Sequence, residues 1–292
     1  MTGHRFSEPR LAFLVYRSRS GSTFFGDRLS RHPEVLVTPE SNVAFRLVNY
    51  FKNRHGKDIS RRKLVEYIYS DQKFKDWKLP QENLAEVLHE YSELNWATTF
   101  YACCRAYQEW KKQEAKVVVF KKSGWYYKNT DLLLSTFPDS LIICMLRDPR
   151  AVYNSACKAL HSETKKPMAG NILKNAFGWW DYVNRLFAAE KQWPGRVLKV
   201  RYESFLPDIS GKLTSIWREL GVLELDNIKL KEILDQQAES HLVTSSTRHL
   251  HGNVGQRPII ERAEGWKHEL PSWRARLIRL ICKKGMGICG YY

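Results

Sequence analysis

The chain has 292 residues, of which 43% are hydrophobic and 27% are charged, and its formal net charge is +16 at pH 7. This length is ample to bury a core, and the composition excludes a disordered chain. Such a positive charge attracts polyanions, which include nucleic acid, anionic membrane and sulfated or phosphorylated ligands, and charge alone does not choose among them.

Four short apolar runs along the chain predict β-strands. They show no clean alternation of apolar and polar residues, which is typical of strands buried on both faces of a parallel sheet. The runs cover residues 11–16, 116–120, 141–146 and 196–202. A short apolar run, VLV, follows the first predicted helix at 35–37 and is not counted among the predicted strands.

Helical patterns separate these runs. They cover residues 22–31, 149–160, 170–190, 208–220 and about 270–284. Residues 43–112 hold several amphipathic stretches and no strong strand, so we expect a helical insertion there, and residues 243–264 indicate a polar loop. Strands that alternate with helices predict an α/β fold with a doubly wound, mostly parallel sheet flanked by helices. We find no linker-like segment and predict a single domain over 1–292.

The first strand runs directly into the sequence RSRSGST at 17–23, and then into a helix. Loop amides and the positive end of a helix favour a bound phosphate or sulfate, and a glycine lets the backbone approach it closely. The candidate contacts are Arg19, Ser20, Gly21, Ser22 and Thr23. A nucleoside triphosphatase would need GxxxxGK[ST], which the chain lacks. The alternative is an ordinary polar corner between a strand and a helix.

A second motif begins where the strand 141–146 ends. Arg147 follows the strand, at the edge of an open α/β sheet where ligands bind, and Asp148 before Pro149 has the place of a helix N-cap. Ser155 comes about two helical turns later and can face the same side as Arg147. The pair can hold one phosphate together. The alternative is an Arg–Asp pair that only caps the helix.

Together the two motifs resemble the sulfotransferases that use 3′-phosphoadenosine 5′-phosphosulfate (PAPS). RSGST is similar to their 5′-phosphosulfate loop, and LRDPRAVYNS is similar to their 3′-phosphate motif. The segment 19–40 resembles the Golgi carbohydrate sulfotransferases and, less closely, the tyrosylprotein sulfotransferases, and so does the end of the chain from Trp273 to Tyr291. The resemblance implies the P-loop-like sulfotransferase fold. It also implies PAPS as co-substrate and transfer to a hydroxyl group.

Sulfonate transfer needs a general base for the acceptor hydroxyl and cations near the leaving oxygen. We expect the base to be Glu40, because the resemblance places a Glu after the HPxV segment and because this residue should lie beside the phosphosulfate loop. Partial burial next to an anion should raise its pKa. His161 is the weaker alternative base.

The cations are expected to be Arg19 and Lys122, since the end of strand 116–120 resembles a lysine segment of the family. The sequence has Gly124 where the family usually has proline, so Lys121 stays open as an alternative to Lys122. With these side chains in place, no metal is required.

Further nucleotide contacts follow from the resemblance alone. Tyr202 is similar to a family tyrosine that touches the nucleotide, and the segment RAEGWK is similar to a late basic loop that folds over it. The resemblance therefore implies contacts from Arg262, Gly265 and Lys267. The same lid would include Arg248, Gly252 and Asn253.

The acceptor is expected to be a carbohydrate hydroxyl, with a tyrosine, phenol or lipid hydroxyl as the alternative. Two other functions stay open: a nucleotide kinase, and a non-catalytic basic protein that binds RNA or a glycosaminoglycan. We expect no nucleic-acid partner and no membrane span. The polar N-terminus and six cysteines without a CxxC spacing favour a soluble, cytoplasmic protein.

Overall fold

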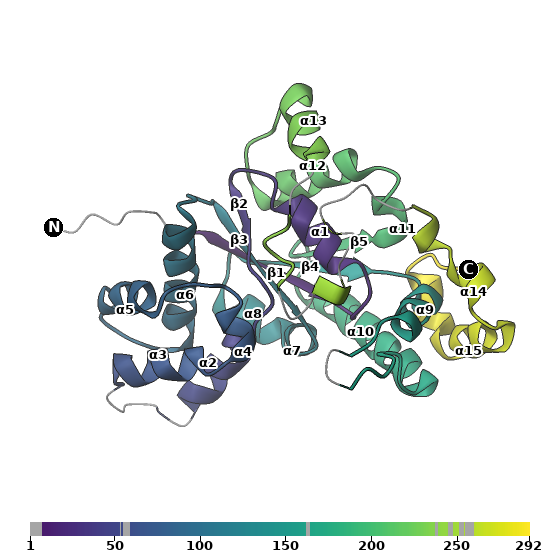
Figure 1. Ribbon diagram of the computed structural model, residues 1–292, viewed down its shortest axis with the longest axis horizontal. Helices are drawn as coiled ribbons and strands as arrows, with labels where there is room; N and C mark the ends of the chain where they lie inside the picture. The colour runs from purple at the N-terminus through teal and green to yellow at the C-terminus, as the bar shows by residue number, and fades with distance from the viewer. Residues whose placement is uncertain are drawn as a thin grey trace.

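The computed structural model describes residues 8–52, 54, 59–161, 164–236, 239–244, 248–250, 254 and 260–292. Within these residues, five parallel strands form one sheet in the order β2-β3-β1-β4-β5, and helices cover both faces (Figure 1). This confirms the predicted α/β fold. The strands are β1 (Arg10–Tyr16), β2 (Val35–Val37), β3 (Val117–Ser123), β4 (Leu141–Leu146) and β5 (Val197–Arg201).

The helices of the described residues fall into three groups along the chain. The first group is α1 (Ser22–Leu29), α2 (Val43–Lys52), α3 (Arg61–Tyr69), α4 (Gln72–Lys75), α5 (Gln81–His89) and α6 (Trp96–Lys111). The second is α7 (Trp125–Lys128), α8 (Thr130–Thr136), α9 (Pro149–Lys158) and α10 (Ile172–Gln192). The third is α11 (Tyr202–Phe205), α12 (Ile209–Leu220), α13 (Asn227–Asp235), the short η1 (Arg248–Leu250) and η2 (Ile260–Ala263), α14 (Trp266–Glu269) and α15 (Ser272–Ile288).

The central strand β1 is buried on both faces, which explains its unbroken apolar sequence. Leu11, Phe13 and Val15 join the core under α2–α8 and α10, whereas Ala12 and Leu14 join the core under α1 and α12. A strand between two cores needs apolar residues at consecutive positions, because successive side chains point to opposite faces.

Two strands differ from the sequence prediction. The run VLV forms the edge strand β2, and β3 continues to Ser123 rather than ending at Phe120. The polar end of β3 stays extended because it pairs with β1 up to Tyr16, so backbone pairing outweighs the loss of apolar character. As a result Lys121 and Lys122 lie on the sheet rather than in a loop.

Strand order decides where a ligand can bind. Strands β1 and β4 are neighbours, but the chain leaves β1 toward β2 on one side and leaves β4 toward β5 on the other. Such a switch point opens a crevice at the carboxyl ends of the strands. The two predicted motifs follow β1 and β4, so both begin at this crevice.

The helices between 43 and 112 support the segment that follows β2. The buried Trp77 side chain donates to the Pro39 carbonyl at 3.0 Å, and Asp71 accepts hydrogen bonds from the backbone and the side chain of Asn42 at 2.8 and 3.0 Å. Glu40 lies between these two anchors. The helical insertion therefore fixes its position.

The C-terminal helix α15 packs closely on α10. A Cβ atom added to Gly285 would lie 2.6 Å from the ring of Trp180 and 3.0 Å from that of Trp179, whereas one added to Gly287 would meet no atom within 4 Å. Trp179 in turn donates to the Arg147 carbonyl at 2.9 Å. This contact links the packing of α15 to the crevice.

No helix of the described residues is both long and apolar enough to cross a membrane.

Gly285 and Gly287 give a matched test of the packing. We expect Gly285→Ala to lower the free energy of unfolding by about 1–3 kcal/mol, because the methyl group overpacks the contact with two tryptophans. Gly287→Ala on the same helix should leave it unchanged or raise it by up to about 1 kcal/mol through helix propensity. Urea denaturation measures both, and equal effects of the two changes would contradict the packing.

Candidate functional site

The loop between β1 and α1 turns at two residues in the left-handed region of the backbone. Arg19 has φ 72° and Gly21 has φ 86°, and the Ser20 amide donates to the Arg17 carbonyl at 3.1 Å. The Arg19 conformation costs about 1–2 kcal/mol, and such strain is common at binding sites. Gly21 precedes α1 and provides no side-chain cap. The first amides of α1 are thus aimed at the crevice in the manner of an anion site.

Gly21 also allows the Tyr202 ring to pack against the loop. A Cβ atom on Gly21 would lie 2.3 Å from this ring, so no other residue fits without displacement. Ser20, Ser22 and Thr23 are buried beside it. The structure therefore brings the five predicted loop residues and the predicted Tyr202 together.

Arg147 joins the two motifs. Its Nη1 atom donates to the Arg19 carbonyl at 2.8 Å and its Nη2 atom donates to the Arg262 carbonyl at 2.8 Å. The Arg19 Nε atom lies 3.2 Å from the Ser155 hydroxyl oxygen, to which it donates. One crevice therefore holds the loop after β1, the start of α9 and the segment that carries Arg262.

The three guanidinium groups of this crevice form a cationic cluster. Burial, and then the charges of Arg147 and Arg262, lower the pKa of Arg19. The Arg147 Nε atom is buried and has no hydrogen-bond partner among the described residues. Clustered guanidinium groups repel one another unless an anion lies between them, and phosphate oxygens match their donors. The crevice thus suits a doubly charged anion.

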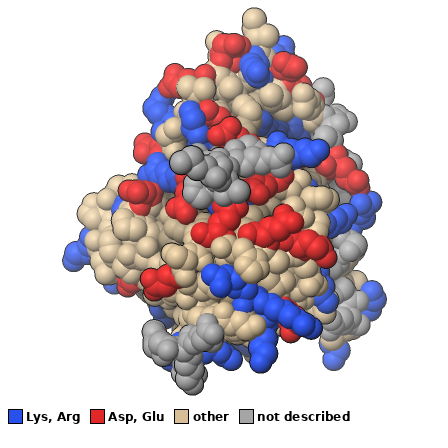
Figure 2. All heavy atoms as spheres, turned by 90° about the vertical axis from the view of Figure 1, so that its left-hand side faces the viewer, with Lys and Arg blue, Asp and Glu red and all other residues tan. Residues whose placement is uncertain are grey.

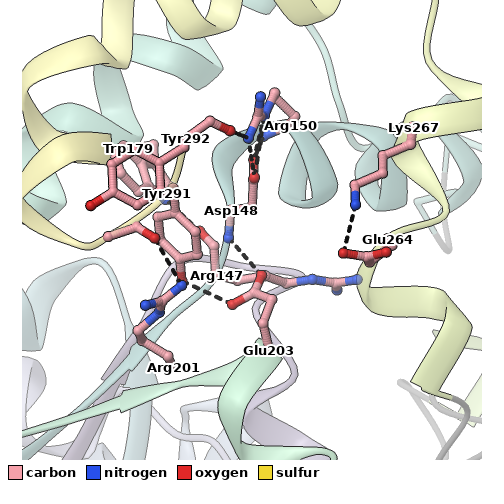
Figure 3. Close-up of polar contacts among 11 residues, drawn as sticks. Arg147, Asp148, Arg150, Trp179, Arg201, Glu203, Glu264, Lys267, Tyr291 and Tyr292 are labelled. Carbon is pink, nitrogen blue, oxygen red and sulfur yellow. Dashed lines mark hydrogen bonds and ion pairs between the residues drawn. The ribbon is translucent and has the colours of Figure 1, made fainter.

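Buried polar contacts hold Arg147 from behind (Figure 3). Asp148 caps α9 as predicted, since its carboxylate accepts from the Arg150 amide at 2.8 Å and pairs with the Arg150 guanidinium at 2.6 Å. The Glu203 carboxylate accepts from the Asp148 amide and from the Tyr291 hydroxyl, each at 2.9 Å. Burial raises the pKa of Glu203. The end of the chain thereby supports the start of the second motif.

The late basic segment reaches the crevice only in part. Arg262 contacts Arg147 through its carbonyl, whereas Lys267 pairs with Glu264 at 2.7 Å (Figure 3). Gly265 begins α14, whose Trp266 ring lies 3.9 Å from the Arg150 guanidinium carbon. Nucleotide contacts from Gly265 and Lys267 stay predictions.

A second polar cluster surrounds Glu40. Its Oε1 atom accepts from Lys122 at 2.9 Å and from Lys73 at 3.0 Å, and its Oε2 atom accepts from the Tyr16 hydroxyl at 3.0 Å. Lys121 is buried next to this group, with its ammonium 5.7 Å from the centre of the Tyr16 ring. The strands β1 and β3, the helix α4 and the loop after β2 all contribute to the cluster.

The predicted rise in the pKa of Glu40 is wrong for this state of the protein. Burial alone would raise it, but the charges of Lys121, Lys122 and Lys73 outweigh burial and hold the pKa of the Glu40 carboxyl well below its ordinary range. The sequence placed one lysine segment near Glu40 and did not reveal that Lys73 of α4 also reaches it. Three cations around one carboxylate favour its charged form.

The choice between the two consecutive lysines follows from their surroundings. Burial lowers the pKa of both lysines, that of Lys121 to about 8, but of the two only Lys122, whose side chain is 14% exposed, donates a hydrogen bond to Glu40 in the described residues. Gly124 has φ 73°, which proline cannot adopt, so the departure from the family pattern reflects a different backbone turn after β3. Lys122 stays our prediction for the catalytic lysine.

Tyr16 connects the Glu40 cluster with the anion loop. Burial and then Glu40 raise the pKa of the Tyr16 hydroxyl well above its ordinary value, while a hydrogen bond with Ser22 acts in the opposite direction. Sequence reasoning missed Tyr16 and Lys73. A tyrosine at the strand end before the loop was a usable signal, but the position of Lys73 depends on how the helical insertion folds back.

Other predicted residues lie outside these two clusters. His161 is exposed beyond the end of α9, and Arg248 forms an exposed ion pair with Glu239 at 2.6 Å. Gly252 and Asn253 lie outside the described residues. Among the described residues, no group of three or more His, Cys, Asp or Glu side chains could hold a metal ion.

The ion pairs of Glu40 predict how stability depends on pH. The folded state lowers this pKa below its ordinary value of 4.5, so the stabilisation is complete above that pH and is lost as the pH falls below it. We expect Glu40→Gln to lower the free energy of unfolding at pH 7 by about 2 kcal/mol and to flatten its decline in acid.

The control is Glu66→Gln, which removes an exposed helix pair with Arg62 and should change stability by less than about 0.5 kcal/mol. Denaturant titrations between neutral and acidic pH measure both variants. If the free energy of unfolding declines with falling pH equally steeply in the Glu40 variant and in the parent, the lysines do not lower the pKa of Glu40 as described.

Comparisons with known proteins agree with this geometry. The model of the sulfotransferase family matches residues 12–226, a range that includes the loop after β1 and the motif after β4. No curated protein matches the chain.

Many solved structures match this chain, and three of them illustrate the shared fold. The sulfotransferase domain of the Synechococcus PCC 7002 olefin synthase is 18% identical, with a TM-score of 0.59, over 95% of this chain and 98% of that one. The sulfotransferase domain from the curacin biosynthetic pathway is 15% identical, with a TM-score of 0.59, over 97% and 98% of the two chains. Mouse sulfotransferase SULT7A1 was solved in complex with PAP, which is adenosine 3′,5′-bisphosphate. It is 12% identical, with a TM-score of 0.56, over 96% of this chain and 86% of that one.

At these identities the solved structures establish the fold, while the family model establishes membership. The narrower resemblance to Golgi carbohydrate sulfotransferases stays a prediction. The predicted family of PAPS-dependent sulfotransferases is confirmed, and the chain belongs to the sulfotransferase family.

Proposed function

We propose that this sulfotransferase moves a sulfonate from PAPS to an acceptor hydroxyl in the crevice between β1 and β4. The observation that carries the proposal is the contact of Arg147 with both Arg19 and Arg262, which gathers three guanidinium groups at one switch point. A doubly phosphorylated nucleotide has the charge that such a cluster needs.

The two motifs divide the nucleotide between them in this proposal. The buried hydroxyl residues and the start of α1 receive the 5′-phosphosulfate, because free amides and a helix N-terminus stabilise anionic oxygens. Arg147 and Ser155 receive the 3′-phosphate, and the Tyr202 ring contacts the nucleotide. Phosphate binding then supplies the negative charge that the hydrogen bond of Arg19 with the neutral Ser155 hydroxyl does not provide.

The chemistry is an in-line displacement at sulfur. The acceptor oxygen forms a bond to sulfur, Glu40 takes the hydroxyl proton, and the bond between sulfur and the bridging phosphate oxygen breaks. Lys122 and Arg19 neutralise the negative charge that develops on this leaving oxygen. The products are the sulfate ester and adenosine 3′,5′-bisphosphate (PAP).

Lys122 also controls how basic Glu40 is. Its ammonium lies 2.9 Å from the carboxylate before any ligand enters, and together with the charges of Lys121 and Lys73 it keeps the pKa of Glu40 low. A sulfonate anion competes for the same ammonium. When Lys122 turns toward the sulfonate, Glu40 loses one of its cations and becomes a stronger base.

The acceptor that we propose is a carbohydrate hydroxyl, with a tyrosine, phenol or lipid as the alternative. Phe45 at the start of α2 is 43% exposed, and its ring contacts that of Trp125, which follows the catalytic end of β3, at 6.1 Å. The face of an exposed aromatic ring is a flat surface on which a sugar ring or a phenol can stack. Phe45 follows the loop that carries Glu40, and Trp125 follows the strand that carries Lys122.

Labelled-sulfonate transfer from PAPS to a panel of glycans, phenols, tyrosine peptides and lipid alcohols tests the function. We expect transfer by the parent and a loss of turnover of about 10²–10⁴-fold in Glu40→Gln, because general base catalysis contributes this much. The affinity for PAP should change little, since Glu40 contacts lysines and Tyr16 rather than the guanidinium cluster.

Glu66→Gln serves again as the control and should retain full turnover. Activity of Glu40→Gln close to that of the parent would exclude Glu40 as the base. Phosphate transfer from ATP with magnesium, in place of sulfonate transfer, would indicate a kinase and overturn the proposal as a whole.

A further inference from the structure

The outward side of α15 combines exposed apolar side chains with positive charge. The helix buries Ile278, Cys282, Gly285 and Met286 against the rest of the protein. On its exposed side, Trp273 is 58% exposed, Leu280 is 74% exposed and Ile288 is 48% exposed. Trp273 and Leu280 lie two helical turns apart and therefore share one side of the helix.

Basic residues flank this apolar stripe. The helix contains five of them and no acidic residue: Arg274, Arg276, Arg279, Lys283 and Lys284. Among the described residues, Arg276, Arg279, Lys283 and Lys284 form no ion pair. A surface helix normally turns a polar face to water, so an apolar stripe bordered by unpaired cations indicates a binding surface.

A shallow groove runs along the same surface. It lies between α10 and α15 and is lined by Trp180, Leu280, Ile281, Ile288 and the two lysines 283 and 284. Gly287 also lines it, and the space above this glycine is open. The groove therefore presents apolar side chains and ammonium groups together.

We propose that α15 is a docking surface for an anionic lipid bilayer, which the protein contacts peripherally. Helices that bind in the plane of a bilayer place Trp and Leu below the headgroups and keep Lys and Arg at the level of the lipid phosphates. The stripe of Trp273, Leu280 and Ile288 supplies the apolar contact below the headgroups. The flanking cations supply the contact with the lipid phosphates, and long basic side chains can reach the headgroups from such positions.

Charge distribution argues for this occupant and for its orientation. Figure 2 shows the face near α5 and α6, where acidic side chains near its centre are interspersed with basic ones, whereas α15, at the right of Figure 1, carries five basic residues and no acidic one. An anionic surface would attract the α15 side more strongly than a face of mixed charge. The net charge of +16 adds to the attraction.

Other occupants fit less well. A second copy of the chain would bring the same unpaired cations of α15 face to face, and like charges across an interface are unfavourable. A nucleic acid or a sulfated glycan would use the cations but would leave Trp273 and Leu280 in water. A bilayer is the partner that uses both features.

Co-sedimentation with phosphatidylcholine vesicles, with and without phosphatidylglycerol, tests the proposal on the full chain. We expect the parent to bind only the mixed vesicles. Lys283→Gln with Lys284→Gln should weaken binding about thirtyfold, and Trp273→Ala with Leu280→Ala at least about tenfold. All four side chains are exposed, so thermal midpoints should stay unchanged.

The matched control is Leu223→Ala with Ile228→Ala, which removes two apolar side chains that are 64% and 83% exposed at the start of the α13 region. This variant should bind like the parent. Unchanged vesicle binding by the Trp273/Leu280 variant, together with binding to heparin, would show a polyanion site and overturn the proposal. Two other results would also overturn the proposal. The parent protein could fail to bind the mixed vesicles, or it could form a dimer that the Trp273/Leu280 variant dissociates.

Discussion

The hydrogen bonds of one buried arginine hold the functional crevice together. Arg147 donates to the carbonyls of Arg19 and Arg262, so a residue at the end of β4 fixes the loop after β1 and a segment near the end of the chain. Its own position depends on Trp179 and on the Asp148–Glu203–Tyr291 contacts behind it. The crevice is therefore built from the sheet, from α10 and from the C-terminus at once.

The second constraint is electrostatic. The crevice gathers the guanidinium groups of Arg19, Arg147 and Arg262, while the neighbouring cluster places three lysines around Glu40. In both places, buried positive charges lie close together and lower the stability of the folded protein. An anionic co-substrate relieves this repulsion, which explains why the two clusters are adjacent and why Tyr16 and Ser22 connect them.

Much of this arrangement could be predicted from sequence, and the rest depended on long-range contacts. Arg19 and Arg147 were identifiable because each follows an apolar strand, and carboxyl ends of parallel strands share one edge. That their strands are neighbours became clear only from the sheet order. The contact of Lys73 with Glu40 could not be predicted, because it arises from the way the helices between 43 and 112 return to β3, and the low pKa of Glu40 depends on this lysine together with Lys121 and Lys122 of β3. The extension of β3 past Phe120 likewise depended on pairing with β1.

The proposed function requires that the guanidinium cluster bind the 3′-phosphate of the nucleotide. Calorimetric titration of the parent and of Arg147→Met with PAP and with adenosine 5′-phosphate, which lacks that phosphate, tests it most directly. The parent should bind PAP at least about tenfold more tightly, since a charge-assisted contact contributes about 1.5–3 kcal/mol, and the variant should lose this preference. Equal affinities of the parent for the two nucleotides, or a preference that survives in Arg147→Met, would contradict the account.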